Sequence, residues 1–475
     1  MSKRTTFIRA ALLATTFALA GCASFSADSG MSAVHQYAGD AIRKDVVAIR
    51  SDVDAAAARA AVDKLLAKRL SADDAVQIAL LNNRDLQAAY NQLGISEAQM
   101  VQASLPPNPS FSIERIAGAG SVEIEARAIA SILALATLPA RAQIAAERFR
   151  QAQLEAAEAT LRIATETRRA YYRALAARVI VNFLIQSQSA AHAATELSTQ
   201  LGEAGTMNRL DQARNQVFYA ELSAQLAQSR QLAATERERL IRAMGLWGPD
   251  LEFKLPASLP RFPAKPSTQP DIEREAVARR LDLQIARIDV LALARNSNLT
   301  NATRFISILD LAGISKKTKS GDETERERGF EVEFQIPIFD LGTAKVRTAE
   351  ETYMQSVNRL AARAVNVRSE AREAYGTYRS AYDIARHYQR EVLPLRKIIS
   401  DETLLRYNAM QIDVFTLLTE ARQRIASTTT AIEAERAYWL AATNLGAAVL
   451  GGGAATGEGG ASGPAMATAE TQGGH

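Results

Sequence analysis

The chain has 475 residues, 56 basic and 52 acidic side chains, and a single cysteine, Cys22. One cysteine excludes an intramolecular disulfide and a cysteine-rich metal site. Much of the basic excess lies in residues 1–21, because removing Lys3, Arg4 and Arg9 leaves 53 basic against 52 acidic side chains. Since no basic stripe with interleaved aromatic residues remains, the sequence does not predict nucleic-acid binding.

Residues 1–21 have the pattern of an export signal. The basic stretch MSKRTTFIR precedes AALLATTFALA, an apolar run that is too short to span a bilayer. The small residues LAG then precede Cys22, which resembles a bacterial lipoprotein signal. That resemblance implies cleavage before Cys22, a covalent lipid on its thiol and, because Ala23 follows rather than aspartate, sorting to the outer membrane. The alternative is an ordinary signal peptide with a chance cysteine. Residues 22–70 would form the lipidated N-terminal segment, to which we assign no further function.

Two very long helices are predicted. Residues 141–201 contain neither glycine nor proline and are rich in strong helix formers, with Pro139 at the expected start. A helix of that length measures about 90 Å, too long for the interior of a compact domain. The second runs from about 343 to 407, with interruptions expected at Gly376 and Pro394. Return helices are expected at about 210–244 and 414–449.

A different pattern precedes each long helix. Apolar and charged residues alternate around Glu123 and Glu125, and again around Glu331 and Glu333, which predicts strands. We expect β-hairpins at about 108–138 and 302–339, with loops at 116–121 and 313–329. Apolar–charged alternation is typical of transmembrane barrels, yet four strands cannot enclose a lumen. Three copies would supply twelve strands. The alternative is two hairpins that decorate a soluble sandwich.

The two halves of the chain follow the same predicted order. Asp85-Leu86-Gln87 matches Asp282-Leu283-Gln284 at an offset of 197 residues. We therefore predict an internal repeat, 71–246 and 271–450, each with helix, hairpin, long helix and return helix. A proline-rich equatorial connection, 247–270, separates the repeats. Residues 451–475 have little apolar content, and we expect this tail to be disordered.

In order along residues 71–451, several segments resemble the TolC-like outer membrane efflux family, in its lipoprotein branch. They include ALLNNRDLQAAYNQLGISEAQMVQASLPPNPSFSIE, VARRLDLQIARIDVLALA, FQIPIFDLGTAKV and RYNAMQIDVFTLLTEARQRIASTTTAIEAERAYWLAATNLGAAVLG. The resemblance implies a mainly α protein with a transmembrane β part: a homotrimer with a twelve-stranded β-barrel and an α-barrel tunnel. It also implies a passive channel of a tripartite efflux system, working with a periplasmic adaptor and an inner-membrane pump. No cofactor is implied beyond the lipid at Cys22.

Two sets of candidate pore residues follow from the pattern and the resemblance. The family closes its periplasmic end at the helix turns, where glycine and aspartates recur; Gly205 and Asp211 match in the first half, whereas Met410 replaces the glycine in the second. The candidates for the aperture are Asp211, Asp413 and Glu420, although Asp413 also suits a helix N-cap. The candidates for the barrel lumen are Glu123, Glu125, Glu331 and Glu333, unless they lie beyond the membrane edge.

Two other functions compete with a channel. A lipid-anchored periplasmic adaptor would have one helical hairpin with β-rich flanking domains. An enzyme is disfavoured because the sequence contains no HExxH, P-loop or GxSxG motif, and His35, His192, His387 and His475 are scattered. The predicted cargo is drugs or metal ions; RYNAMQIDVF resembles a branch that handles copper or other metals, but no metal site is evident.

Overall fold

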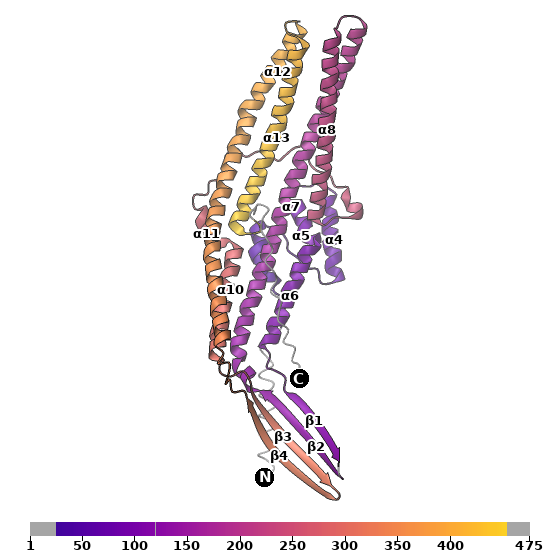
Figure 1. Ribbon diagram of the computed structural model, residues 1–475. Helices are drawn as coiled ribbons and strands as arrows, with labels where there is room; N and C mark the ends of the chain where they lie inside the picture. The colour runs from indigo at the N-terminus through magenta and orange to yellow at the C-terminus, as the bar shows by residue number, and fades with distance from the viewer. Residues whose placement is uncertain (1–24, 119, 454–475) are drawn as a thin grey trace.

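A computed structural model describes residues 25–118 and 120–453. The signal sequence and Cys22 lie outside these residues. The molecule is long, with a β-sheet at one end and two pairs of long helices that extend to the other (Figure 1). Shorter helices lie beside the long ones, from the middle of the molecule toward the sheet (Figure 1).

The longest helix, α7 (Ile132–Glu203), has 72 residues and packs antiparallel against α8 (Arg209–Met244). The expectation that it starts at Pro139 is wrong, because Pro139 lies inside the helix. The helix begins after Ser131, whose Oγ accepts a hydrogen bond from the Ala134 amide. Leucine and alanine in the first turns favour the helix strongly. They outweigh the single backbone hydrogen bond that a proline removes.

The second helical hairpin consists of α11 (Thr343–His387), a π-helical turn (Tyr388–Val392), α12 (Leu393–Asn408) and α13 (Val414–Leu450). The interruption predicted at Pro394 is confirmed, since the π-helical turn ends just before it. The one predicted at Gly376 is wrong, because α11 continues through it. A glycine costs a helix only about 1 kcal/mol, and Tyr378 and Tyr382 in the next turns are buried in the core.

Shorter helices lie along the long ones. They are α2 (Met31–Val34), a π turn (His35–Gly39), α3 (Asp40–Ile42), α4 (Asp52–Leu66), α5 (Ala72–Asn82), α6 (Arg84–Ser104), α9 (Ile272–Arg279) and α10 (Leu281–Ala302). Ser51 and Ser71 are the N-caps of α4 and α5 and form capping boxes. Each serine side chain accepts a hydrogen bond from the backbone amide of an aspartate, whose carboxylate accepts one from the backbone amide of the serine. Between α6 and α7, Tyr90 and Thr160 share a buried hydroxyl–hydroxyl hydrogen bond of 2.9 Å.

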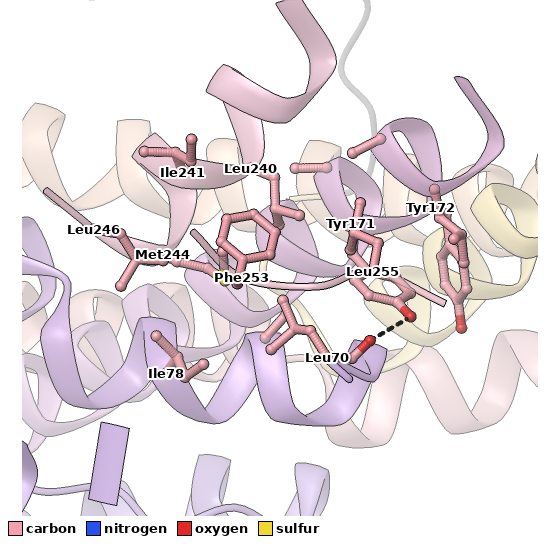
Figure 2. Close-up of a cluster of buried hydrophobic side chains, with 14 of the residues drawn as sticks. Leu70, Ile78, Tyr171, Tyr172, Leu240, Ile241, Met244, Leu246, Phe253 and Leu255 are labelled. Atoms are coloured by element: carbon pink, nitrogen blue, oxygen red, sulfur yellow. Dashed lines mark hydrogen bonds between the residues drawn. The ribbon is translucent and has the colours of Figure 1, made fainter. Parts of the chain in front are cut away.

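The proline-rich connection closes a core at the middle of the molecule. Phe253, Leu255 and Leu259 are buried there, against residues of α5, α7 and α8. Figure 2 shows this cluster, in which Tyr171 of α7 donates its hydroxyl to the Leu70 carbonyl at 3.0 Å. Phe262 of the connection stacks on Tyr382 of α11, with 5.0 Å between the ring centres, so the connection packs against both helical hairpins. It contains one short 3-10 helix, Gly248–Leu251.

The start of the C-terminal tail departs from the expectation of disorder. Gly451 and Gly452 are buried. Gly452 lies so close to the α7 backbone that a side chain there would meet Leu161 and Arg162, and the Gly453 carbonyl accepts a hydrogen bond of 2.7 Å from Arg169. The first three tail residues are thus part of the folded body. The rest lies outside the described residues.

The sheet is antiparallel, in the order β1 (Ser110–Gly118), β2 (Ser121–Ser131), β3 (Leu309–Ser320) and β4 (Glu323–Phe334). The loop predicted at 313–329 is wrong, because most of it is strand and only Gly321 and Asp322 separate β3 from β4. Gly321 has φ 59°, which suits a two-residue hairpin turn. The sequence does not predict these strands because both of their faces carry charged side chains. The alternation of apolar and polar residues that indicates a strand is therefore absent.

Candidate functional site

The sheet has two chemically different faces, which the strand register defines. Glu123 pairs with Thr318, Glu125 with Lys316, Glu331 with Ala312 and Glu333 with Asp310. Directly paired residues point to the same side of a sheet, so the four glutamates predicted for the lumen share one face. We call it the acidic face; it also carries Glu114, Arg127, Glu325 and Glu327. The other, the apolar face, carries Phe111, Ile113, Ala126, Ala128, Leu311, Phe330, Val332 and Phe334.

Ion pairs tie the strands together on the acidic face. Lys316 Nζ lies 2.7 Å from Glu123 Oε1, which joins β3 to β2. Arg127 contacts Glu125 on its own strand and lies 3.6 Å from Glu331 of β4. Since the acidic side chains outnumber Arg127 and Lys316, this face keeps a net negative charge.

Exposure distinguishes the two faces in the central strand β3. Ala312 is buried, and Ile314, Lys316 and Thr318 are half-buried on the acidic face. Their neighbours Leu311, Gly313, Ser315 and Lys317 on the apolar face are exposed. The acidic face is therefore the more enclosed one, as on the concave side of a curved sheet.

The first helical tip joins α7 to α8. Gly205 has φ 72°, a left-handed conformation that glycine adopts at little cost. Asn208 caps α8 by accepting a 2.8 Å hydrogen bond from the Asp211 amide. The Asp211 carboxylate lies in the first turn, 3.1 Å from Arg214. This aperture candidate is thus at the tip and paired within its own helix.

The second tip, between α12 and α13, has Met410 where the first has Gly205. Met410 adopts φ 59° and is 94% exposed. A side chain with a Cβ atom is strained in this left-handed region, by about 1–2 kcal/mol. Met410 replaces the glycine that the family has at this turn, and its backbone has the left-handed conformation that glycine adopts at little cost.

Exchanging residues at these two turns should change stability in opposite directions. We expect Met410→Gly to stabilise the second tip by about 0.5–1 kcal/mol, the relief of strain less the greater freedom of glycine in the unfolded chain. Gly205→Ala should destabilise the first tip by about 1 kcal/mol. Amide hydrogen exchange at each tip measures both effects, with the other tip as internal control. Faster exchange at the second tip of Met410→Gly would contradict the assignment of strain.

Asp413 is the N-cap of α13. Its carboxylate accepts hydrogen bonds from the Thr416 hydroxyl at 2.6 Å and the Thr416 amide at 2.9 Å. These bonds, the hydroxyl bond first, hold the pKa of Asp413 below its usual range. The capping role anticipated for Asp413 is therefore present, and its carboxylate also remains exposed at the tip.

The Thr416 hydroxyl gives this pKa a direct test. We expect Thr416→Val to raise the pKa of Asp413, measured by NMR titration of the carboxyl carbon. Because the folded pKa is depressed, Asp413 stabilises the tip above its unfolded pKa of about 3.9, and that stability is lost as pH falls through the folded value. Thr419→Val is the control, since the Thr419 hydroxyl donates to the Phe415 carbonyl. An equal rise in both variants would disprove the role of Thr416.

Glu420 differs from the other two aperture candidates because it is buried. It is 8% exposed, and its Oε2 accepts a 3.2 Å hydrogen bond from Arg396 of α12. Its other oxygen has no partner among the described residues. The side chain borders a groove of about 450 Å³ between α7, α8, α12 and α13. The structure thus places Asp211 and Asp413 at the tips and Glu420 inside the helical body.

Sequence reasoning missed a set of contacts that join the two tips. Arg214 of α8 lies over the Phe415 ring of α13, 5.1 Å from its centre. Arg422 of α13 lies 2.8 Å from Glu221 and over the Phe218 ring. The sequence gives no sign of these contacts, because it does not show that α8 and α13 pack against each other. That packing is seen only in the fold.

Within residues 25–118 and 120–453, no group of three or more His, Cys, Asp or Glu side chains is arranged to hold a metal ion. His35, His192 and His387 each lie beside one carboxylate only, at 3.2–3.6 Å. In that same part of the chain, none of the helices combines the length and hydropathy needed to cross a membrane.

The fold matches several solved outer membrane channels. OprN aligns with a TM-score of 0.67 and 17% identity over 91% of this chain and 97% of its own. The Campylobacter jejuni CmeC outer membrane channel aligns with 0.68 and 15% over 80% and 86%. The open state of the Neisseria gonorrhoeae MtrE outer membrane channel aligns with 0.64 and 15% over 80% and 88%. No family model and no curated protein matches the sequence. The resemblance to TolC-like outer membrane efflux proteins is thereby confirmed at the level of fold.

Proposed function

Because the chain has the fold of the outer membrane efflux channels, we propose that three copies form a passive conduit across the outer membrane and periplasm. Each copy would contribute four strands to a twelve-stranded barrel and four long helical segments to a tunnel. An inner-membrane pump and a periplasmic adaptor would deliver the cargo. The observation that carries the proposal is a sheet with one apolar face, one acidic face and two open edges.

The open edges make a single copy incomplete in a membrane. Strands β1 and β4 lie at the ends of the strand order and have no second neighbour among the described residues. In lipid, every unpaired backbone group is costly, so a sheet must close. Strands β1 and β4 run in opposite directions because three antiparallel pairings separate them. The β4 edge of one copy can therefore pair antiparallel with the β1 edge of the next, and a ring of three closes.

The length of the helices fits a conduit. At 1.5 Å per residue, the 72 residues of α7 extend for about 108 Å. The sheet and the helical tips lie at opposite ends of the molecule (Figure 1). With the barrel in the outer membrane, the tips reach deep into the periplasm, where they would meet the adaptor and pump.

The acids at the tips, exposed Asp413 and half-buried Asp211, support a charged aperture. Asp211 and Asp413 would each contribute three carboxylates around the threefold axis. Alanine substitution at either position should change single-channel current and block by divalent cations. Glu420→Ala is the informative contrast because Glu420 is buried beside Arg396. Unchanged current and block in Asp211→Ala and Asp413→Ala would refute the aperture role.

The experiment that tests the function uses the purified full chain. Native mass spectrometry should show a trimer, and the trimer should give discrete conductance steps in planar phosphatidylcholine bilayers. Trimers that bind an inner-membrane pump but never conduct would favour the adaptor alternative. A monomer that never conducts would refute the channel.

A second experiment distinguishes drug cargo from metal-ion cargo. The gene is deleted, and survival is measured against copper, silver, zinc and a drug panel.

The lipid proposed at Cys22 would have a separate role. Once a barrel closes, the protein needs no lipid to stay in the membrane, so the lipid would sort and hold each copy until three meet. Cys22→Ser behind an ordinary cleavable signal should still give conducting trimers, at reduced yield. Normal trimer insertion with complete loss of conductance would contradict this role.

A further inference from the structure

We propose that the hairpin end of the apolar face binds the phosphorylated headgroups of outer-leaflet lipid. The inference rests on the proposed function, because it needs the apolar face to point outward in a membrane. Five basic side chains form this surface, which we call the basic end: Arg115, Lys317, Lys319, Arg326 and Arg328. All five are exposed.

The register places the basic end in three neighbouring rows across the sheet. Arg115 is opposite Ile124, which is opposite Lys317, which is opposite Arg326, so three of these residues lie in one row. Lys319 lies in the row nearer the hairpin turns, and Arg328 in the row nearer the helices. Three strands of each copy thus present basic side chains at one level. In a closed trimer they would form a belt of fifteen.

The basic end differs from the basic residues of the acidic face. Lys316 and Arg127 form ion pairs with Glu123, Glu125 and Glu331. In the part of the chain that the structure describes, none of the five basic-end residues forms an ion pair with an acidic side chain. Acidic residues neighbour them in sequence but point to the opposite face. The charge of the basic end is therefore left to an external anion.

The position of the basic end fits an anionic headgroup layer. The same face is apolar toward the helices, at Phe330, Val332 and Phe334, and exposed apolar residues continue at Ile336 and Ile338. The basic rows follow directly on the side of the hairpin turns, which is the end of the sheet remote from the helices (Figure 1). Helices that extend into the periplasm place this end in the outer leaflet. Lysine and arginine there can keep their stems in the apolar layer and their charges among phosphates.

The test compares lipids that differ only in phosphate. The full-length trimer in detergent is titrated with diphosphorylated lipid A, with lipid A lacking both phosphates, and with inorganic phosphate, and bound lipid is counted by native mass spectrometry. We expect binding of the diphosphorylated form and weaker binding of the other two. Each basic residue at a charged membrane surface corresponds to about a 5-fold change in affinity. Lys317→Gln should therefore weaken binding by about 5-fold and Lys317→Gln with Arg326→Gln by about 25-fold.

Lys316→Gln is the matched control, because Lys316 is the adjacent residue on the opposite face, paired with Glu123. It should leave lipid binding within about 2-fold. Equal binding of both lipid A forms, equal losses in Lys316→Gln and Lys317→Gln, or tight binding of inorganic phosphate alone would overturn the inference. Conductance in phosphatidylcholine bilayers is read separately. Trimers that conduct but bind both lipid A forms equally overturn only this inference. A protein that never conducts contradicts the proposed channel, and with it the outward orientation of the apolar face on which the belt depends.

Discussion

Val332→Lys is expected to abolish assembly of the proposed trimer in a membrane. Val332 lies on the apolar face beside Leu311, with which it pairs across the β3–β4 ladder. A lysine facing lipid near the middle of a bilayer costs about 2–4 kcal/mol per copy, and the proposed trimer would carry three. Heat-modifiable trimers in outer membrane fractions, detected on gels, measure the loss.

Glu333→Lys is the matched control for this prediction. It introduces the same side chain one residue further along, on the acidic face and opposite Asp310. We expect the proposed trimers to assemble normally and their preference for cations to fall, because three negative charges in the proposed lumen would become positive. Loss of assembly in Glu333→Lys, with normal assembly in Val332→Lys, would mean that the faces are assigned the wrong way round.

Leu240→Ala is expected to lower the free energy of unfolding by about 2–5 kcal/mol. Leu240 of α8 is fully buried in the central cluster with Phe253 and Tyr171 (Figure 2). The substitution removes buried apolar atoms and leaves a cavity where α7, α8 and the proline-rich connection meet. The denaturant midpoint of the purified protein, followed by circular dichroism, should fall accordingly.

Val53→Ala provides the comparison for Leu240→Ala. Val53 lies on α4 and is 77% exposed, so its truncation should change the free energy of unfolding by less than about 0.5 kcal/mol. A midpoint that falls equally in both variants would show that the central cluster does not stabilise the described fold.

The long helices could be predicted because their sequence signals are local. Helix formers without glycine or proline predicted the body of α7, and the return helices α8 and α13 begin and end within one residue of the expected positions. The errors at Pro139 and Gly376 have a common cause. Each expectation considers one unfavourable residue without the neighbours that favour the helix. For Pro139 these neighbours are Ser131 and the following leucines, and for Gly376 they are two buried tyrosines.

The sheet shows where sequence reasoning fails. Strands with one apolar side, such as residues 330–334, are visible as alternation. Where both faces of a strand pair carry charge, as at 315–328, the sequence looks like a charged loop. Only the register shows that Lys317 and Arg326 share one face, whereas Lys316 and Glu327 share the other. The placement of Glu420 was equally invisible, because burial beside Arg396 depends on how α12 packs on α13.

We propose that the acidic face lines water and the apolar face meets lipid. Single cysteines at Glu123, Glu125, Glu331, Glu333, Val332 and Phe334, in a background with Cys22 removed, test it by labelling with a membrane-impermeant thiol reagent in intact outer membranes. We predict labelling at the four glutamate positions and protection at Val332 and Phe334. Protection at all four glutamate positions, with labelling at Val332 and Phe334, would contradict the claim.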